Sequence, residues 1–132
     1  AASGKDVTLD QLRFFTPLKG VVTNRFNPSQ QHFGIDIASA KNEAVKAAYD
    51  GTVIFAEWTA ETGYVMAIQH TGNVISVYKH NSVLLRKQGS FVRAGETITI
   101  VGTSGEYSTG PHLHFELWIN GKAVNPEQYL VF

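Results

Sequence analysis

Short runs of alternating or β-branched apolar residues make up most of the chain, and long helical patterns are scarce. Side chains that alternate in polarity every second residue are typical of strands with one buried face. Many short runs of this kind predict an all-β domain of antiparallel strands, arranged as a sandwich or a barrel. The predicted strands are Val21–Phe26, Gly34–Ala38, Ala44–Tyr49, Thr52–Ala56, Val65–Gln69, Val74–Lys79, Thr97–Val101 and His112–Ile119.

Turn-forming dipeptides separate several of these runs. Asp-Gly and Asn-Gly favour tight hairpins because the central residues of such turns need positive φ. The sequence therefore predicts tight turns at Asp50-Gly51, Gly72-Asn73 and Asn120-Gly121.

Helical signal is limited to the two ends of the chain. Thr8 is a candidate cap for a short helix, and Asn125 followed by Pro126 indicates a single helical turn. Residues 1–16 are the least strand-like part and are predicted to be an N-terminal arm. Residues 17–132 are predicted to be one β domain.

Composition and charge narrow the classes of partner. The 132 residues include 11 basic and 11 acidic side chains, so the formal net charge is zero. A balanced charge gives no attraction to nucleic acid or to an anionic membrane, and no apolar run is long enough to span one. The chain has no cysteine, so any bound metal would have to be held by histidine and carboxylate.

Two of the five histidines, His112 and His114, are separated by one leucine in the segment HLHFE. Residues i and i+2 of a strand share a face, so His112, His114 and Glu116 are predicted to project together. The intervening apolar residues would then fill the core. A solvated outer face that carries two histidines by chance is the alternative interpretation.

A second cluster lies in the segment QQHFGIDIA. His32 and Asp36 are four residues apart with Gly34 between them, and a bend at this glycine would bring the two side chains together. An incidental surface histidine near a turn aspartate is an equally good interpretation of this cluster alone. Together with one of the paired histidines, however, His32 and Asp36 would supply three ligands. Three nitrogen or oxygen ligands and an open fourth position are typical of catalytic zinc.

The other two histidines differ in their surroundings. His80 is predicted to end a strand just before an Asn-Ser turn, where side chains often reach a cleft. His70 lies directly against a hairpin turn, and we expect it to bond turn backbone and to have a structural role.

Three segments, HFGIDIA, VYKH and GTSGEYSTGPHLHFEL, occur in the order that is found in the lysostaphin-type (LytM-like) zinc metalloendopeptidases. The resemblance runs from about Pro17 to Leu130 and therefore covers nearly the whole chain. It implies a β fold of the duplicated hybrid motif type. Each segment alone would be a weak signal, but the combination is highly specific.

The resemblance also implies roles for individual residues. His32, Asp36 and His114 match the zinc ligands of this family, and His80 and His112 match its catalytic histidines. Some active members carry a tyrosine shortly before the first ligand, whereas the segment NRFNPSQQ has none.

The substrate implied by the resemblance is the peptide part of bacterial peptidoglycan, cut by an endopeptidase. The implied location is extracytoplasmic, in the periplasm, the cell wall or the medium. A regulatory segment or partner outside this chain is compatible with the resemblance. Loops at residues 58–64 and 81–90 are candidates for the walls of the substrate cleft, and residues 102–110 are predicted to form a mobile loop at its rim.

Other functions share parts of this pattern. The main alternative is a non-catalytic peptidoglycan-binding activator of a wall amidase, which has the same fold but has lost metal ligands; the intact set of five residues speaks against it. A sugar-transport phosphocarrier of the glucose type also uses two close histidines, but it needs no aspartate at the position of Asp36. A zinc-stabilised scaffold would not need the two additional histidines, His80 and His112.

Overall fold

The computed structural model describes residues 13–102 and 110–132. These residues form an antiparallel β structure with two short 3-10 turns, η3 and η4, so the predicted all-β fold is confirmed. In chain order the elements are β1 (Val21–Asn24), η3 (Pro28–Gln30), β2 (Ile35–Ala38), β3 (Ala44–Lys46), β4 (Gly51–Thr59), β5 (Gly63–His70), β6 (Val74–Leu84), β7 (Phe91–Val92), β8 (Thr97–Val101), β9 (His112–Ile119), β10 (Lys122–Val124) and η4 (Pro126–Gln128).

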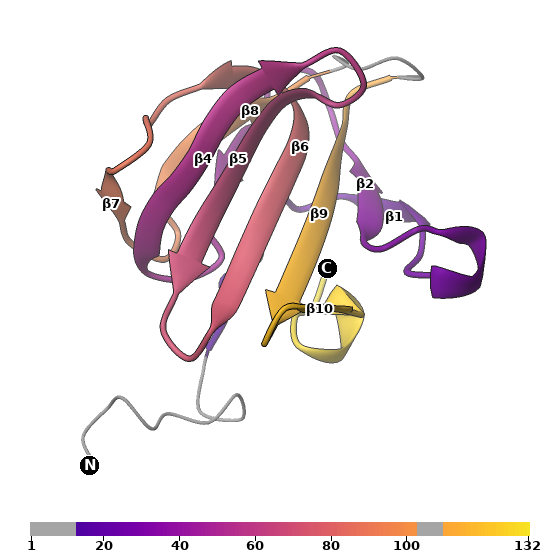
Figure 1. Ribbon diagram of the computed structural model, residues 1–132. Coiled ribbons are helices and arrows are strands. Elements are labelled where there is room, and N and C mark those ends of the chain that lie inside the picture. Colours follow the sequence, from indigo (N-terminus) through magenta and orange to yellow (C-terminus); the bar gives the residue numbers. More distant parts are fainter. Residues whose placement is uncertain (1–12, 103–109) are drawn as a thin grey trace.

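The strands follow the order β1-β2-β9-β6-β5-β4-β7 across one sheet, and every pair is antiparallel. Within the described residues this path does not close on itself, so the sheet is not a closed barrel. At one end of the path, β7 pairs only with Gly51 and Thr52 of the longer strand β4. Figure 1 shows β4, β5, β6 and β9 in a twisted layer, with β8 behind it.

The long strand β6 joins this layer to the β8–β3 pair behind it. Its first half, residues 74–79, pairs with β9, and its second half, residues 81–84, pairs with β8. Strand β8 in turn pairs with β3. Because β6 exchanges one neighbour for another halfway along, the sheet folds over and encloses an apolar core.

The core consists mainly of β-branched and aromatic side chains that alternate along the strands. These residues form one continuous cluster, and its largest fully buried members include Tyr78, Phe115, Ile35, Ile37, Met66, Ile68, Ile98, Leu113 and Leu117. Burial of this much apolar area is the main favourable term in folding, at about 25 cal/mol per Å².

Two of the three predicted turns are confirmed. Asn73 and Asn120 both have positive φ, as do the neighbouring Gly72 and Gly121. Asn120 and Gly121 form a two-residue loop between β9 and β10, since Ile119 pairs with Lys122.

The predicted turn at Asp50-Gly51 is wrong, because Gly51 is the first residue of β4 and the preceding strand β3 pairs with β8. Glycine is needed there for space. A Cβ atom on Gly51 would lie 2.4 Å from the carbonyl oxygen of Gln69.

Segments near both ends of the described residues pack on the β domain. The predicted helix cap Thr8 lies outside the described residues, and residues 13–16 are not helical. The Phe14 ring packs edge-on against Tyr49 and Tyr129. The single turn predicted after Asn125 is confirmed as η4, because the Asn125 side chain accepts a hydrogen bond of 3.0 Å from the Glu127 N–H. No helix in the described ranges is both long and apolar enough to cross a bilayer.

A chain of hydrogen bonds runs through the core. The Ala48 N–H donates to the Tyr78 hydroxyl (2.9 Å), which lies 2.7 Å from Ser76 Oγ, and Ser76 Oγ lies 2.7 Å from His70 Nε2. His70 Nδ1 donates to the Asp50 carbonyl oxygen (2.8 Å). His70 therefore bonds backbone as expected, but the backbone is that of the segment before β4 and not that of the adjacent hairpin turn. A carbonyl can only accept, so neutral His70 carries its proton on Nδ1 and accepts from Ser76 at Nε2.

Burial of these side chains has consequences for their ionisation. Burial lowers the pKa of His70, although the Asp50 carbonyl and carboxylate oppose this effect. Burial likewise raises the pKa of Tyr78 to about 12. Both groups are therefore neutral over the physiological range, as the one-directional chain of hydrogen bonds requires.

We expect His70 to make folding stability depend on pH. The folded state holds His70 neutral, while the unfolded state takes up a proton near pH 6.5. Its stabilising effect is therefore complete above that pH and is lost as the pH falls below it. Between about pH 7.5 and about pH 5.5, the wild type should lose up to about 1 kcal/mol of unfolding free energy more than His70→Gln. Urea unfolding of both proteins, in chelator at both pH values, measures this difference; parallel losses would contradict it.

Candidate metal centre and cleft

The register of three strands brings the central polar residues together. In the sheet, Asp36 of β2 lies directly opposite His114 of β9, and His114 lies directly opposite Lys79 of β6. Directly opposed residues in antiparallel strands project from the same face. These three side chains therefore form a row across the outer face of the sheet.

The predicted alternation along β9 is confirmed. Leu113, Phe115 and Leu117 are fully buried in the core. His112 and His114 project from the opposite face, as does Glu116, which is only 7% exposed because other side chains surround it. Alternate residues of the segment HLHFE therefore face the core and the polar site.

His32 reaches the same site from the connection between β1 and β2. It follows η3 and pairs in an isolated bridge with Asn27. Gly34 lies between His32 and Asp36, and its φ is not in the left-handed region. Its role is close approach, because a Cβ on Gly34 would lie 2.5 Å from the Phe115 carbonyl oxygen and 2.9 Å from His114 Nε2. The glycine lets this segment lie directly on β9.

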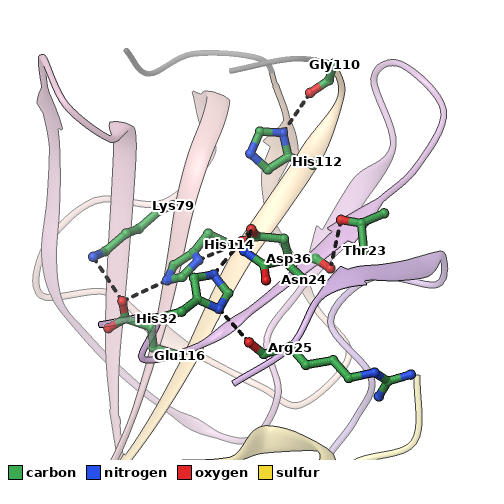
Figure 2. Close-up of polar contacts among 10 residues, drawn as sticks. All are labelled: Thr23, Asn24, Arg25, His32, Asp36, Lys79, Gly110, His112, His114 and Glu116. Atoms are coloured by element: carbon green, nitrogen blue, oxygen red, sulfur yellow. Dashed lines mark hydrogen bonds and ion pairs between the residues drawn. The ribbon is translucent and has the colours of Figure 1, made fainter. Parts of the chain in front are cut away.

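The ligand atoms of His32, Asp36 and His114 all lie within 4.8 Å of one another. Figure 2 shows the three side chains pointing toward a common centre. Nε2 of His32 lies 3.3 Å from one Asp36 oxygen, and Nδ1 of His114 lies 2.7 Å from the other. The three side chains are between 12% and 22% exposed, so the group is open on one side.

Hydrogen bonds fix which nitrogen of each histidine faces this centre. His32 Nδ1 donates to the Arg25 carbonyl oxygen (2.8 Å), and His114 Nε2 donates to Glu116 Oε2 (2.9 Å). The other nitrogen of each ring, Nε2 of His32 and Nδ1 of His114, therefore carries a lone pair in the neutral form.

This arrangement fits a divalent metal ion. Nε2 of His32 is buried and has no hydrogen-bond partner, which is unfavourable unless another group binds it. Two imidazole nitrogens and one carboxylate oxygen are ligands that zinc accepts, and the partners Arg25 and Glu116 resemble the outer groups that orient metal-bound histidines.

The charges at this centre stabilise one another. Burial alone would raise the pKa of Asp36, but hydrogen bonding and the charges of His114 and His32 outweigh it and lower the pKa. Burial alone would lower the pKa of His114, but hydrogen bonds and charge from Asp36 and Glu116 raise it. Binding of a metal at Nδ1 of His114 would therefore displace a proton.

The ionised carboxylate of Glu116 is stabilised by three neighbouring side chains. Burial would raise its pKa, but hydrogen bonds from His114 and Trp118 and the Lys79 charge lower it to about 2. Trp118 Nε1 donates to Glu116 Oε1 (2.8 Å), and Lys79 Nζ lies 3.0 Å from Oε2. A carboxylate with three cationic or donor partners is poorly suited to accept a proton in catalysis.

His80 and His112 lie beside the three candidate ligands. Their ring centroids are 4.8 Å apart, and the His80 ring centroid lies 6.3 Å from that of His114. His112 Nδ1 donates to the Gly110 carbonyl oxygen (2.7 Å), so Nε2 of neutral His112 can accept a proton. The expectation that His80 ends a strand just before a turn is wrong, because β6 continues to Leu84 through a bulge at this residue.

All five histidine and aspartate residues selected from the sequence line one cleft of about 330 Å³. Three further residues line it that the sequence analysis did not select, namely Glu61, Thr62 and Lys79. Trp118 could have been found by strand parity, since it shares a face of β9 with His112 and His114. Lys79 could not, because it reaches the cleft through its position opposite His114 on the neighbouring strand. No sequence signal pointed to Glu61 or Thr62 individually.

The predicted cleft walls are partly confirmed. Glu61 and Thr62 belong to the expected loop at residues 58–64. The expected loop at residues 81–90 begins instead as a strand, with Asn81 fully buried. Residues 103–109 of the third expected loop lie outside the described residues.

With an open β fold and a three-ligand centre at a cleft, the chain has the architecture of a metallopeptidase domain. The model of peptidase family M23 matches residues 30–126. The chain therefore belongs to peptidase family M23, and the predicted lysostaphin-type family is confirmed.

Individual relatives differ in what they are said to do. The chain is 39% identical over 117 residues to murein hydrolase activator NlpD of Escherichia coli, and the match covers 86% of the chain. It is 43% identical over 95 residues to the DD-carboxypeptidase/endopeptidase Mpg of Neisseria gonorrhoeae, covering 72% of the chain. The solved structure of a zinc-containing peptidase from Vibrio cholerae is 29% identical, with a TM-score of 0.81, over 86% of the chain and 39% of that structure.

The chain is short relative to these proteins. The matched region is 30% of NlpD and 22% of Mpg. The comparisons thus connect this domain both with a peptidase and with an activator of murein hydrolases.

We expect Glu116 to contribute to stability through its buried contacts. Glu116→Ala would leave Lys79, the His114 ring nitrogen and the Trp118 N–H without their acceptor, and should cost about 2–4 kcal/mol of unfolding free energy. The matched control is Glu127→Ala, which breaks an ion pair with the mostly exposed Arg25 and should cost less than about 1 kcal/mol. Urea unfolding of the metal-free proteins measures both. Equal losses would show that the Glu116 contacts add nothing beyond an exposed pair.

Proposed function

We propose that this domain is a zinc-dependent endopeptidase that hydrolyses cross-links or stem peptides of bacterial peptidoglycan. The observation that carries the proposal is the convergence of all five family residues on one open cleft. Membership of peptidase family M23 supports the same reaction class. The substrate is inferred from the family and from the murein-related names of the relatives.

In this proposal His32 Nε2, an Asp36 carboxylate oxygen and His114 Nδ1 hold the zinc ion. A zinc ion bound there would supply Lewis acidity toward the scissile carbonyl and a water molecule of lowered pKa. Glu116 holds the His114 ring through its Nε2–H, and the Arg25 carbonyl holds the His32 ring through its Nδ1–H. These contacts keep both rings oriented while a substrate enters and leaves.

His112 acts as general base and acid in this proposal, and His80 assists it. The Gly110 carbonyl binds Nδ1–H of His112, so Nε2 accepts a proton from the attacking water and later returns it to the leaving amine. His80, with its ring beside that of His112, orients the water and stabilises charge that develops on the substrate oxygen. Acid–base assistance of this kind contributes about 10²–10⁴-fold to a rate.

The sequence departs from some active members by having no tyrosine before the first ligand. In this region Asn24 Nδ2 donates to Asp36 Oδ2 (3.4 Å), and Arg25 binds His32 through its carbonyl. These two residues support the proposed ligands. We infer that His80 and His112 provide the stabilisation of the transition state that the tyrosine supplies elsewhere.

A second candidate function is the activation of a wall amidase without catalysis, favoured by the 39% identity to NlpD. A domain of this kind needs no metal ligands, yet the cleft of this chain retains the full set. Either function requires contact with peptidoglycan, so we propose an extracytoplasmic location. A regulatory segment or partner outside this chain remains part of the proposal.

The roles of the five residues predict two classes of variant. His32→Ala, Asp36→Ala and His114→Ala should lose both zinc and hydrolysis. His112→Ala and His80→Ala should keep zinc while the rate falls by about 10²-fold or more. Elemental analysis of the purified proteins and a peptidoglycan digestion assay separate the classes, with Glu127→Ala as the control. A fully active His112→Ala protein would remove this residue from catalysis.

Digestion of purified peptidoglycan distinguishes the enzyme from the activator. The domain alone should release muropeptides, a chelator should stop the release, and added zinc should restore it. Mass spectrometry of the products identifies the bond that is cut. If release occurred only after an amidase was added, and persisted in Asp36→Ala, the domain would be an activator and the enzymatic proposal would be wrong.

A further inference from the structure

Strand parity alone would direct His80 away from the cleft. Along β6 the buried residues are Val74, Ser76 and Tyr78, so regular alternation would place the next one, His80, in the core. Instead His80 and its neighbour Lys79 both line the cleft. Asn81 takes the core position and is fully buried.

A β-bulge causes this change of parity. Tyr78 of β6 pairs with Met66 of β5, whereas Asn81 pairs with Tyr64. Two residues of β6, Lys79 and His80, therefore lie opposite the single residue between Tyr64 and Met66. His80 has φ of 70°, a left-handed conformation that is unfavourable for any residue with a Cβ atom.

The buried side chain of Asn81 holds the strand on one side of the bulge. Its Nδ2 donates to the carbonyl oxygens of Tyr64 (2.8 Å) and Tyr78 (2.9 Å). Its Oδ1 accepts a hydrogen bond of 2.7 Å from Thr99 Oγ1, and Thr99 is also fully buried. The amide thus links β5, both sides of the bulge in β6, and β8.

Gly102 holds the backbone on the other side. Its N–H donates to the His80 carbonyl oxygen (3.0 Å), and its carbonyl oxygen accepts from the His112 N–H (3.3 Å). A Cβ on Gly102 would lie 2.5 Å from the Ser82 nitrogen, so only glycine fits. The His80 N–H donates to the Thr62 carbonyl oxygen (2.8 Å).

We propose that Asn81, Thr99 and Gly102 are positioning residues that hold His80 in the left-handed conformation and so turn its imidazole toward His112. The His80 backbone is thereby held in an unfavourable conformation that places its side chain in the cleft. Backbone strain of this kind is common at functional sites. The catalytic consequence rests on the proposed function, whereas the conformational claim does not.

Melting temperatures test the conformational claim. His80→Gly should melt about 3 °C or more above His80→Ala, because glycine adopts positive φ without a steric penalty. At His112, which lies in regular strand, the order should reverse, with the glycine variant melting below the alanine variant. If His80→Gly melts at or below His80→Ala, the backbone is not held in this conformation and the proposal fails.

A matched pair at Thr99 tests the positioning role. Thr99→Val is isosteric but cannot donate to Asn81, whereas Thr99→Ser keeps the hydroxyl. Thr99→Val should lower kcat by about tenfold or more, with KM within about twofold and zinc content unchanged, and Thr99→Ser should restore kcat. Equal kcat in both variants, or loss of zinc in Thr99→Val, would overturn the proposal.

A spectroscopic measurement keeps this result separate from the proposed function. The nuclear Overhauser contact between the His80 and His112 rings should be present in the wild type and Thr99→Ser and weakened in Thr99→Val. If it persists unchanged in Thr99→Val, the positioning claim is wrong. If the wild type does not cut peptidoglycan while the melting and ring-contact results hold, the proposed function fails and the positioning claim stands.

Discussion

The antiparallel register of β2, β9 and β6 is the constraint on which the rest of the site depends. It sets Asp36 opposite His114, and His114 opposite Lys79, on the outer face of the sheet. Because side chains alternate along a strand, a slip of one residue would move the whole polar set into the core and expose its apolar neighbours. Burial of residues such as Leu113 and Phe115 therefore fixes the register, and through it the geometry of the site.

Charges of opposite sign follow one another across this face. Asp36 contacts His114, His114 contacts Glu116, and Glu116 contacts Lys79. Partly buried charges of this kind are tolerated because each has a partner that satisfies it. A divalent cation at the centre would replace the proton that Asp36 and His114 now share, so metal binding and protonation compete for the same position.

How much the sequence predicts depends on whether a feature is local. The two faces of the strand at residues 112–116 follow from alternation alone, and they were predicted correctly. The bulge at His80 was not, because VYKHNS looks regular and the bulge is held by Thr99 and Gly102, which are distant in the chain. The turn expected at Asp50-Gly51 failed for a similar reason, since tertiary contacts override the preference of the dipeptide.

Strand β7 is short and leaves most of the outer edge of β4 without a strand partner among the described residues. It covers only the first two residues of β4, so the outer backbone of residues 54–59 has no strand partner among the described residues. Ile54, Phe55 and Trp58 are exposed along this edge, at 40%, 37% and 56%. Unprotected edges of this kind invite self-association, and the charge of Glu57 among these apolar residues is the type of guard that natural sheets use against it. Solubility of the isolated domain would thus rest in part on one glutamate that has no role in the chemistry.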